Sequence, residues 1–303
     1  MYLLGAVVGV TLGLLAPHVS EIAEALIWPL LALLLFATFA QTPLRLIPEA
    51  LKDRRFMTTA LLANFVLAPV FVWLILQLMP ADATLRLGLA LVLVVPCTDW
   101  FLTFTQLGRG DMRHAISLTP VNLLLQLLLL PLYIPLLVGS DLPTRSITVI
   151  LPAILVLLVP LALAAVCEFT VFKRPGGNTV RESLSWFPVP VLALVILCVT
   201  ASNAPRLPLA AGAIPYVVAA SITFAVLGFA TAVLLTRWVG LPSAQGRTLA
   251  FTLMTRNSFV VLPIALALPA GWELASLVIV TQSFVELFVL MAAVRVVPRV
   301  IKN

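Results

Sequence analysis

Long apolar runs separated by short polar segments dominate the chain. A helix needs about 20 mostly apolar residues to cross a bilayer, and ten runs approach or reach that length. We therefore predict membrane-spanning helices at 2–17, 24–41, 55–79, 84–107, 114–138, 148–172, 183–201, 212–238, 247–269 and 272–296. Apolar and charged residues alternate over 42–54, which predicts a short helix lying in the membrane interface.

The composition supports this pattern. Of the 303 residues, 62% are hydrophobic and only 10% are charged, whereas soluble domains average about 45–50% and about 25%. Such a chain cannot cover a water-facing surface, which excludes a soluble enzyme. We expect no cofactor, no resident metal and no nucleic-acid partner, because the sequence carries neither a P-loop nor a metal-ligand motif and its basic residues lie in short loops. The sequence leaves open whether a separate helper ATPase acts with the chain.

The basic residues also orient the chain. If the N-terminus is placed in the cytoplasm, only Arg86, Arg145 and Arg206 fall in outside segments, and most other Lys and Arg residues fall inside. The positive-inside rule requires this bias. No basic residue precedes the first apolar run, which indicates a membrane span and not a cleavable signal. We predict a multi-pass protein of the plasma (inner) membrane with both termini cytoplasmic.

Three charged residues lie in the middle of predicted spans: Asp99, Arg256 and Glu286. A charge at this depth costs about 2.5–3.5 kcal/mol by insertion scales, and such residues usually face a bundle interior or a water-filled cavity. They are therefore candidates for function. Asp99 and Arg256 also have a structural interpretation, as an ion pair between two helices, and the sequence leaves both interpretations open.

Two of the spans carry signals for a helix break. Pro96 disrupts the fourth span just before Cys97 and Thr98, because proline removes a backbone donor and clashes with the preceding turn. A polar run from Thr255 to Ser258, which includes Arg256 and Asn257, interrupts the ninth span. Interrupted segments at corresponding positions of two halves are typical of a transporter binding site.

The two halves of the chain match around these breaks. Sliding spans four and five onto nine and ten superimposes the breaks and sets Asn122 against Gln282 and Gln126 against Glu286. Residues four apart share a helix face, so each helix presents a polar stripe. An odd number of spans separates the halves, which predicts a five-plus-five inverted repeat. Alternatively, the amides only hold helices together, at about 0.6 kcal/mol for each hydrogen bond.

The stretch VPCTDWFLTFTQLGRGD, the Asn-x-x-x-Gln of span five and the segment around Glu286 resemble arsenite-efflux permeases. That family shares a superfamily with the bile acid:sodium symporters. The resemblance implies an all-α membrane protein of ten helices in an inverted repeat, with broken helices four and nine crossing. It implies one transporter domain over 1–303. Helices three to five and eight to ten form a core, about 55–138 and 212–297, and helices one, two, six and seven form a panel, about 1–41 and 148–201.

The resemblance further implies that Cys97 and Glu286 are the functional pair. The chain departs from the arsenite branch by carrying Asp99 and Trp100 after the Pro-Cys-Thr, and Arg256 in span nine. It also lacks the Ser-Asn pair and the Glu-x-x-x-Gln that the sodium symporters use as cation ligands.

These observations favour a secondary transporter that exports arsenite or a related metalloid oxyacid by alternating access, driven by protons. Cys97 would contact the metalloid, and Glu286 with Gln282 would carry the coupling proton. The predicted substrate-binding residues line the two breaks and the span-five stripe: Cys97, Thr98, Asp99, Asn122, Gln126, Arg256, Asn257 and Ser258. One alternative is a carrier of a small organic anion, coupled to protons or sodium, whose carboxylate Arg256 would bind. Another is a membrane receptor or structural protein without transport.

Overall fold

A computed structural model describes residues 2–42, 52–98, 100–139, 147–174, 176–204 and 211–302. These residues form helices and connecting turns, and no β-strand occurs among them. Most of the predicted interfacial helix, as well as Asp99, lies outside the described residues. Six described helices are long and apolar enough to cross a membrane: His18–Gln41, Arg54–Gln77, Met112–Val138, Thr179–Ser202, Ile214–Val239 and Leu274–Val300. The chain is therefore a multi-pass membrane protein.

Three shorter apolar helices accompany the long ones, at Leu4–Leu15, Ala83–Val94 and Leu155–Thr170. The predicted span 84–107 corresponds to α6 (Ala83–Val94) and α7 (Trp100–Leu107). The predicted span 247–269 overlaps α14 (Ser243–Met254), which begins four residues earlier, and includes α15 (Ser258–Leu266). Both spans that the sequence predicted to be broken are thus interrupted, at the positions of Pro96 and of the polar run.

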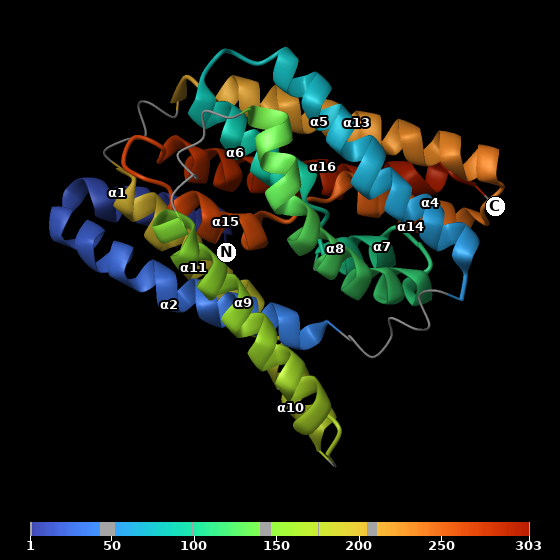
Figure 1. Ribbon diagram of the computed structural model, residues 1–303, viewed down its shortest axis with the longest axis horizontal. Helices are drawn as coiled ribbons and strands as arrows, with labels where there is room; N and C mark the ends of the chain where they lie inside the picture. The colour runs from blue at the N-terminus through green and yellow to red at the C-terminus, as the bar shows by residue number, and fades with distance from the viewer. Residues whose placement is uncertain are drawn as a thin grey trace. The chain divides into compact units, whose positions relative to one another are not determined.

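The chain divides into two compact units, and the first comprises 1–42, 143–214 and 259–280. Its main helices are α1 (Tyr2–Leu15), α2 (Pro17–Gln41), α9 (Ile147–Thr170), α10 (Gly177–Leu184) and α11 (Pro188–Ser202). Helix α11 packs against α1 and α2, and α2 also packs against α9 (Figure 1). A Cβ atom at Gly9 would lie 2.1 Å from Thr200 Oγ1. Small residues of this kind let membrane helices approach closely.

The second unit comprises 43–142, 215–258 and 281–303. Its helices are α4 (Arg54–Leu62), η2 (Ala63–Leu67), α5 (Ala68–Gln77), α6, α7, α8 (Met112–Val138), α13 (Ile214–Val239), α14 and most of α16 (Leu274–Val300). Helix α14 is buried from Gln245 to Met254, and α6 is buried from Leu87 to Val94. A helix buried on all sides belongs to the core, so α6 and α14 lie in the interior of the second unit.

Aspartates set where two helices of the second unit begin. Asp53 Oδ1 accepts the Phe56 N–H at 3.1 Å ahead of α4, and Asp111 Oδ1 accepts the N–H groups of Arg113 and His114 ahead of α8. The first N–H groups of a helix have no partner within it, and a side-chain cap satisfies them. The carboxylates therefore mark the polar ends of two spans.

Candidate functional site

The two helix breaks lie side by side in the second unit. Cys97 N–H donates to the Thr255 carbonyl at 3.2 Å, and Asn257 N–H donates to the Val95 carbonyl at 2.8 Å. Together these bonds form a short antiparallel bridge between Pro96 and Arg256. Irregular backbone inside a bilayer is tolerated only where protein or a cavity satisfies it. Each break supplies backbone partners for the other, which explains how both persist.

Polar side chains gather where the two breaks meet. Asn257 Nδ2 donates to Thr98 Oγ1 at 3.3 Å, which joins the two breaks a second time. Ser258 Oγ lies 3.2 Å from Gln282 Oε1, so α16 is joined to the start of α15. Cys97 is buried at the same place, with 2% of its surface exposed. The structure thus brings together five of the residues that the sequence singled out.

The Glu286 side chain binds a backbone N–H group of the second break. Its two carboxylate oxygens accept the Arg256 backbone N–H at 3.1 and 3.0 Å. Gln282 Nε2 donates to Glu286 Oε2 at 2.6 Å, as the four-residue spacing on one helix face predicts. Glu286 is 5% exposed. The carboxylate therefore acts as a cap for an N–H group that the interrupted helix leaves without an intrahelical partner.

The Arg256 side chain lies in a buried cradle. Its Nη2 donates to Asn64 Oδ1 at 3.2 Å and to the carbonyls of Thr252 and Leu253 at 3.1 and 2.6 Å. The guanidinium carbon lies 4.6 Å from the centroid of the Phe224 ring, which adds a cation–π contact. Among the described residues, its Nε and Nη1 find no hydrogen-bond partner. A buried donor without a partner costs about 1–3 kcal/mol, so these two atoms are available to a ligand.

The span-five stripe carries two buried amides, and one of them, Asn122, adjoins the same cradle. Asn122 and Gln126 are buried on α8, and Asn122 Nδ2 donates to Thr252 Oγ1 at 3.3 Å. Asn64 Nδ2 donates to the same hydroxyl at 3.0 Å. Within the described part of the chain, Asn122 Oδ1 and both polar atoms of Gln126 have no hydrogen-bond partner. The stripe therefore contributes buried polar atoms that a bound molecule can satisfy.

Comparison of the sequence with models of known protein families assigns the chain to one of them. The family model of the Sodium Bile acid symporter family matches residues 28–207. The chain belongs to the sodium bile acid symporter family. No curated protein matches it. Members of the family are transporters and not enzymes. The matched range includes the first break and the α8 stripe, and it ends before Arg256 and Glu286.

In this family member, sequence reasoning missed three residues that hold Arg256: Asn64, Thr252 and Phe224. Asn64 carried a usable signal, since it is an amide within an apolar span. It lies in the π-helical turn η2, a feature that often occurs at functional sites. Thr252 and Phe224 carried no signal, because threonine and phenylalanine are ordinary in apolar helices. The predicted Asp99–Arg256 pair stays a prediction, since Asp99 lies outside the described residues.

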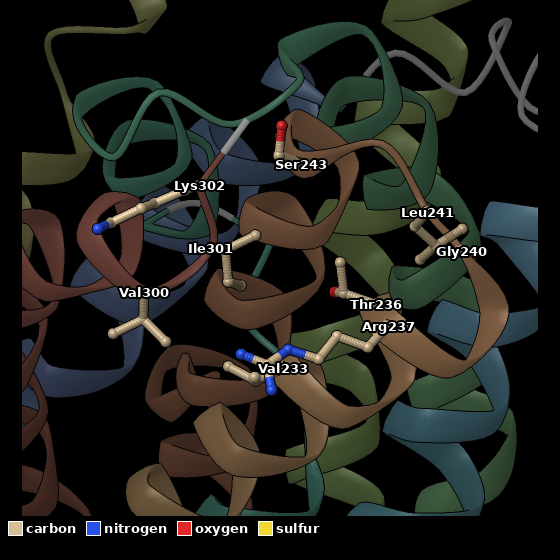
Figure 2. A pocket seen from close by; sticks show the side chains of 9 residues that line it. All are labelled: Val233, Thr236, Arg237, Gly240, Leu241, Ser243, Val300, Ile301 and Lys302. Atoms are coloured by element: carbon tan, nitrogen blue, oxygen red, sulfur yellow. The ribbon is translucent and has the colours of Figure 1, made fainter.

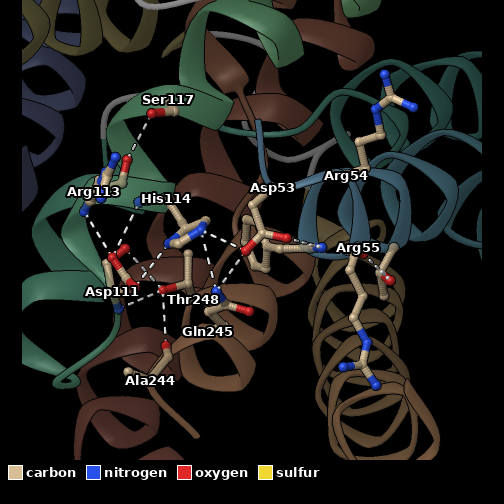
Figure 3. A network of polar contacts seen from close by, with 12 residues as sticks. Asp53, Arg54, Arg55, Asp111, Arg113, His114, Ser117, Ala244, Gln245 and Thr248 are labelled. Atoms are coloured by element: carbon tan, nitrogen blue, oxygen red, sulfur yellow. Dashed lines mark hydrogen bonds and ion pairs between the residues drawn. The ribbon is translucent and has the colours of Figure 1, made fainter. Parts of the chain in front are cut away.

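A second polar network joins the starts of α4, α8 and α14 (Figure 3). His114 Nε2 lies 3.0 Å from Asp53 Oδ2, and its Nδ1 lies 2.8 Å from Asp111 Oδ2. Gln245 Nε2 donates to Asp53 Oδ2 at 2.9 Å. The Phe56 N–H, together with Gln245 and His114, holds the pKa of Asp53 below its ordinary value, although burial opposes this. Asp53 therefore stays a carboxylate at neutral pH.

The described ranges contain no group of three or more His, Cys, Asp and Glu residues placed to hold a metal ion.

Proposed function

We propose that the chain is a secondary transporter whose ten spans form a five-plus-five inverted repeat and whose substrate binds where the two breaks cross. The support is the pair of backbone hydrogen bonds between Val95–Cys97 and Thr255–Asn257. Discontinuous helices near the middle of the membrane form the substrate sites of many transporters. The core and panel boundaries, the location in the plasma membrane and the cytoplasmic termini belong to the same proposal.

The substrate that we propose is arsenite or a related metalloid oxyacid, carried outward. One observation carries this choice: the Cys97 thiol is buried, and the Cys97 backbone pairs with the break that carries Arg256. Thiolate sulfur is a soft ligand that suits soft elements, and nearby cations favour reactive cysteines. The Thr98 and Ser258 hydroxyls, together with the amide of Asn257, provide hydrogen-bonding groups suited to the hydroxyls of an oxyacid.

In this proposal Glu286 couples transport to protons. The ionised carboxylate accepts the Arg256 N–H with both oxygens and the Gln282 amide with one of them. A protonated carboxyl has no charge and one of its oxygens carries a donor proton, so it accepts the same bonds more weakly. Uptake of a proton therefore weakens the cap on the break. Protonation and the geometry of the substrate site change together, as exchange of a substrate for a proton requires.

A second candidate function rests on the Arg256 donors. The Nε and Nη1 atoms are buried, and no described residue accepts a hydrogen bond from them. A small organic anion would satisfy them with a carboxylate, since charge-assisted bonds of this kind are the stronger ones. The proposed class of substrate then changes to organic anions, while the proposed position of the site at the two breaks stays the same.

Growth of a metalloid-sensitive host on arsenite and antimonite tests the choice. We expect the chain to protect the host and Cys97→Ser to abolish protection at unchanged membrane expression. Cys198→Ser is the matched control, since Cys198 is also buried in a span but lies in the first unit, and it should protect fully. Full protection by Cys97→Ser would exclude the thiol as the metalloid ligand. If Arg256→Lys lost transport while Cys97→Ser kept it, the result would favour a small organic anion as the substrate.

A further inference from the structure

A basic cavity of about 550 Å³ opens beside the first turns of α4 and α8. The charged and titratable side chains that line it are Lys52, Asp53, Arg54, Arg55, Arg113 and His114. Four of these are fixed cations and one is a carboxylate, so the walls carry a clear excess of positive charge. The cavity adjoins the network around His114 (Figure 3). It is separate from the crossing of the breaks.

The cations of this cavity are largely uncommitted. Arg55 Nη2 donates to the Val239 carbonyl at the end of α13, so Arg55 is held by the protein. The side chains of Lys52, Arg54 and Arg113 make no hydrogen bond or ion pair with any described residue. The one lining carboxylate, Asp53, is already engaged by Phe56, Gln245 and His114. The positive charge is therefore available to an anion from outside the protein.

The position of the cavity indicates which anion. Two helices that are long and apolar enough to span the membrane, Arg54–Gln77 and Met112–Val138, both begin at its walls. The polar ends of spans lie at the depth of the lipid headgroups. Basic pockets between membrane helices bind anionic headgroups, and the phosphate of such a lipid is present there at high local concentration. A free phosphate ion has the same chemistry but no such concentration.

We infer that this cavity binds the phosphate group of an anionic membrane lipid. Lys52 and Arg54 lie at the start of α4 and Arg113 at the start of α8, and Figure 3 shows Arg54 and Arg113 on opposite sides of the His114–Asp53 pair. The phosphate therefore lies between the two helix starts, where the positive charge of both walls attracts it. Bound lipid thereby joins α4 to α8 and stabilises the second unit. The hydroxyl of Ser117 also lines the cavity and donates to the Arg113 carbonyl at 2.9 Å.

A neighbouring cavity of about 470 Å³ supplies the internal control (Figure 2). It lies between the end of α13, the start of α14 and the C-terminal end of α16. Only two cations line it, Arg237 and Lys302, and most of its other walls are apolar. Removing those two cations changes the net charge as much as removing Arg54 and Arg113, at a different place in the same unit.

The experiment uses the purified full chain in micelles doped with phosphatidylglycerol or phosphatidylcholine. Native mass spectrometry measures the lipid retained, and a thermal melt measures the stabilisation. We expect selective retention of phosphatidylglycerol, and we expect Arg54→Ala/Arg113→Ala to weaken it roughly tenfold or more, because each basic residue near an anionic lipid contributes about fivefold. Arg237→Ala/Lys302→Ala should bind as the wild type does. Arg54→Lys/Arg113→Lys, which keeps the charge, should also retain the lipid.

Three results would overturn the assignment. The first is equal retention of the two lipids by the wild type. The second is an equal loss of phosphatidylglycerol in both double alanine variants, which would indicate a general effect of net charge. The third is stabilisation by inorganic phosphate in phosphatidylcholine micelles without retention of phosphatidylglycerol, which would give the cavity to a free anion.

Discussion

Two polar clusters of the second unit use the same chemistry in different surroundings. The inner cluster consists of Asn64, Thr252, Arg256, Gln282 and Glu286, all of which are buried. The boundary cluster consists of Asp53, Asp111, His114 and Gln245, whose Asp53 side chain is 37% exposed. In both clusters a carboxylate accepts backbone N–H groups that have no intrahelical partner. In the boundary cluster the carboxylate precedes its own helix, whereas Glu286 reaches the break from another helix.

The difference shows how burial changes the stabilisation that a capping side chain provides. At the membrane boundary, water can replace a lost partner, so a capping residue contributes only about 1 kcal/mol. In the inner cluster the polar groups are buried, so a lost partner leaves a buried donor or charge uncompensated. The inner cluster should therefore be much more sensitive to substitution than the boundary cluster. The following changes test that order, beginning with the largest expected effect.

Glu286→Leu should have the largest effect. It removes the acceptor of two buried donors, the Arg256 backbone N–H and the Gln282 amide, at a cost of about 1–3 kcal/mol in unfolding free energy for each. Glu286→Gln keeps the size and one acceptor, so it should fold. Thermal melting of the purified variants measures the difference. In vesicles with an imposed pH gradient, Glu286→Gln should bind and exchange substrate yet fail to accumulate it.

A melt of Glu286→Leu that matches the wild type would mean that the break is satisfied without the carboxylate. The cap that Glu286 supplies from another helix would then be no stronger than the cap that Asp53 supplies to its own helix. The proposed difference between the two clusters would be wrong. Accumulation of substrate by Glu286→Gln in response to the gradient would leave the cap intact but would remove Glu286 as the coupling site.

Asn64→Leu should have an intermediate effect. Asn64 Oδ1 accepts from Arg256, and its Nδ2 donates to the Thr252 hydroxyl and the Ala60 carbonyl. Losing this amide should cost about 1–3 kcal/mol and should also lower transport, since Arg256 loses a partner that orients it. Gln77→Leu, at the exposed end of α5, is the matched amide control and should behave as the wild type. Equal melts for the two variants would argue that Asn64 does not hold Arg256.

Asp53→Ala should have the smallest effect of the three, about 1 kcal/mol, because it removes an N-cap at the boundary. Asp53→Asn keeps a capping side chain and should lose less. The wild type should also lose stability in acid: the pKa of Asp53 lies below its ordinary value of 3.8, so its contribution is present above that value and disappears as the pH falls through the lowered pKa. Melts at about pH 5 and about pH 3 should show a steeper loss in the wild type than in Asp53→Asn.

Parallel pH dependence of the wild type and Asp53→Asn would exclude Asp53 as the titrating group. A loss in Asp53→Ala as large as that in Glu286→Leu would contradict the proposed role of water at the boundary.

The sequence by itself determined the features that local geometry controls. Hydropathy identified long apolar helices, proline and a polar run located the two breaks, and the four-residue spacing placed Gln282 beside Glu286. Each depends on bonds within one helix, where the helical repeat dictates which atoms meet. Tertiary structure alone decided that Asn64 and Phe224 hold Arg256, that Glu286 caps the break, and that His114 links Asp53 to Asp111. In a membrane protein apolar side chains face lipid and neighbouring helices alike, so hydropathy does not reveal which faces pack together.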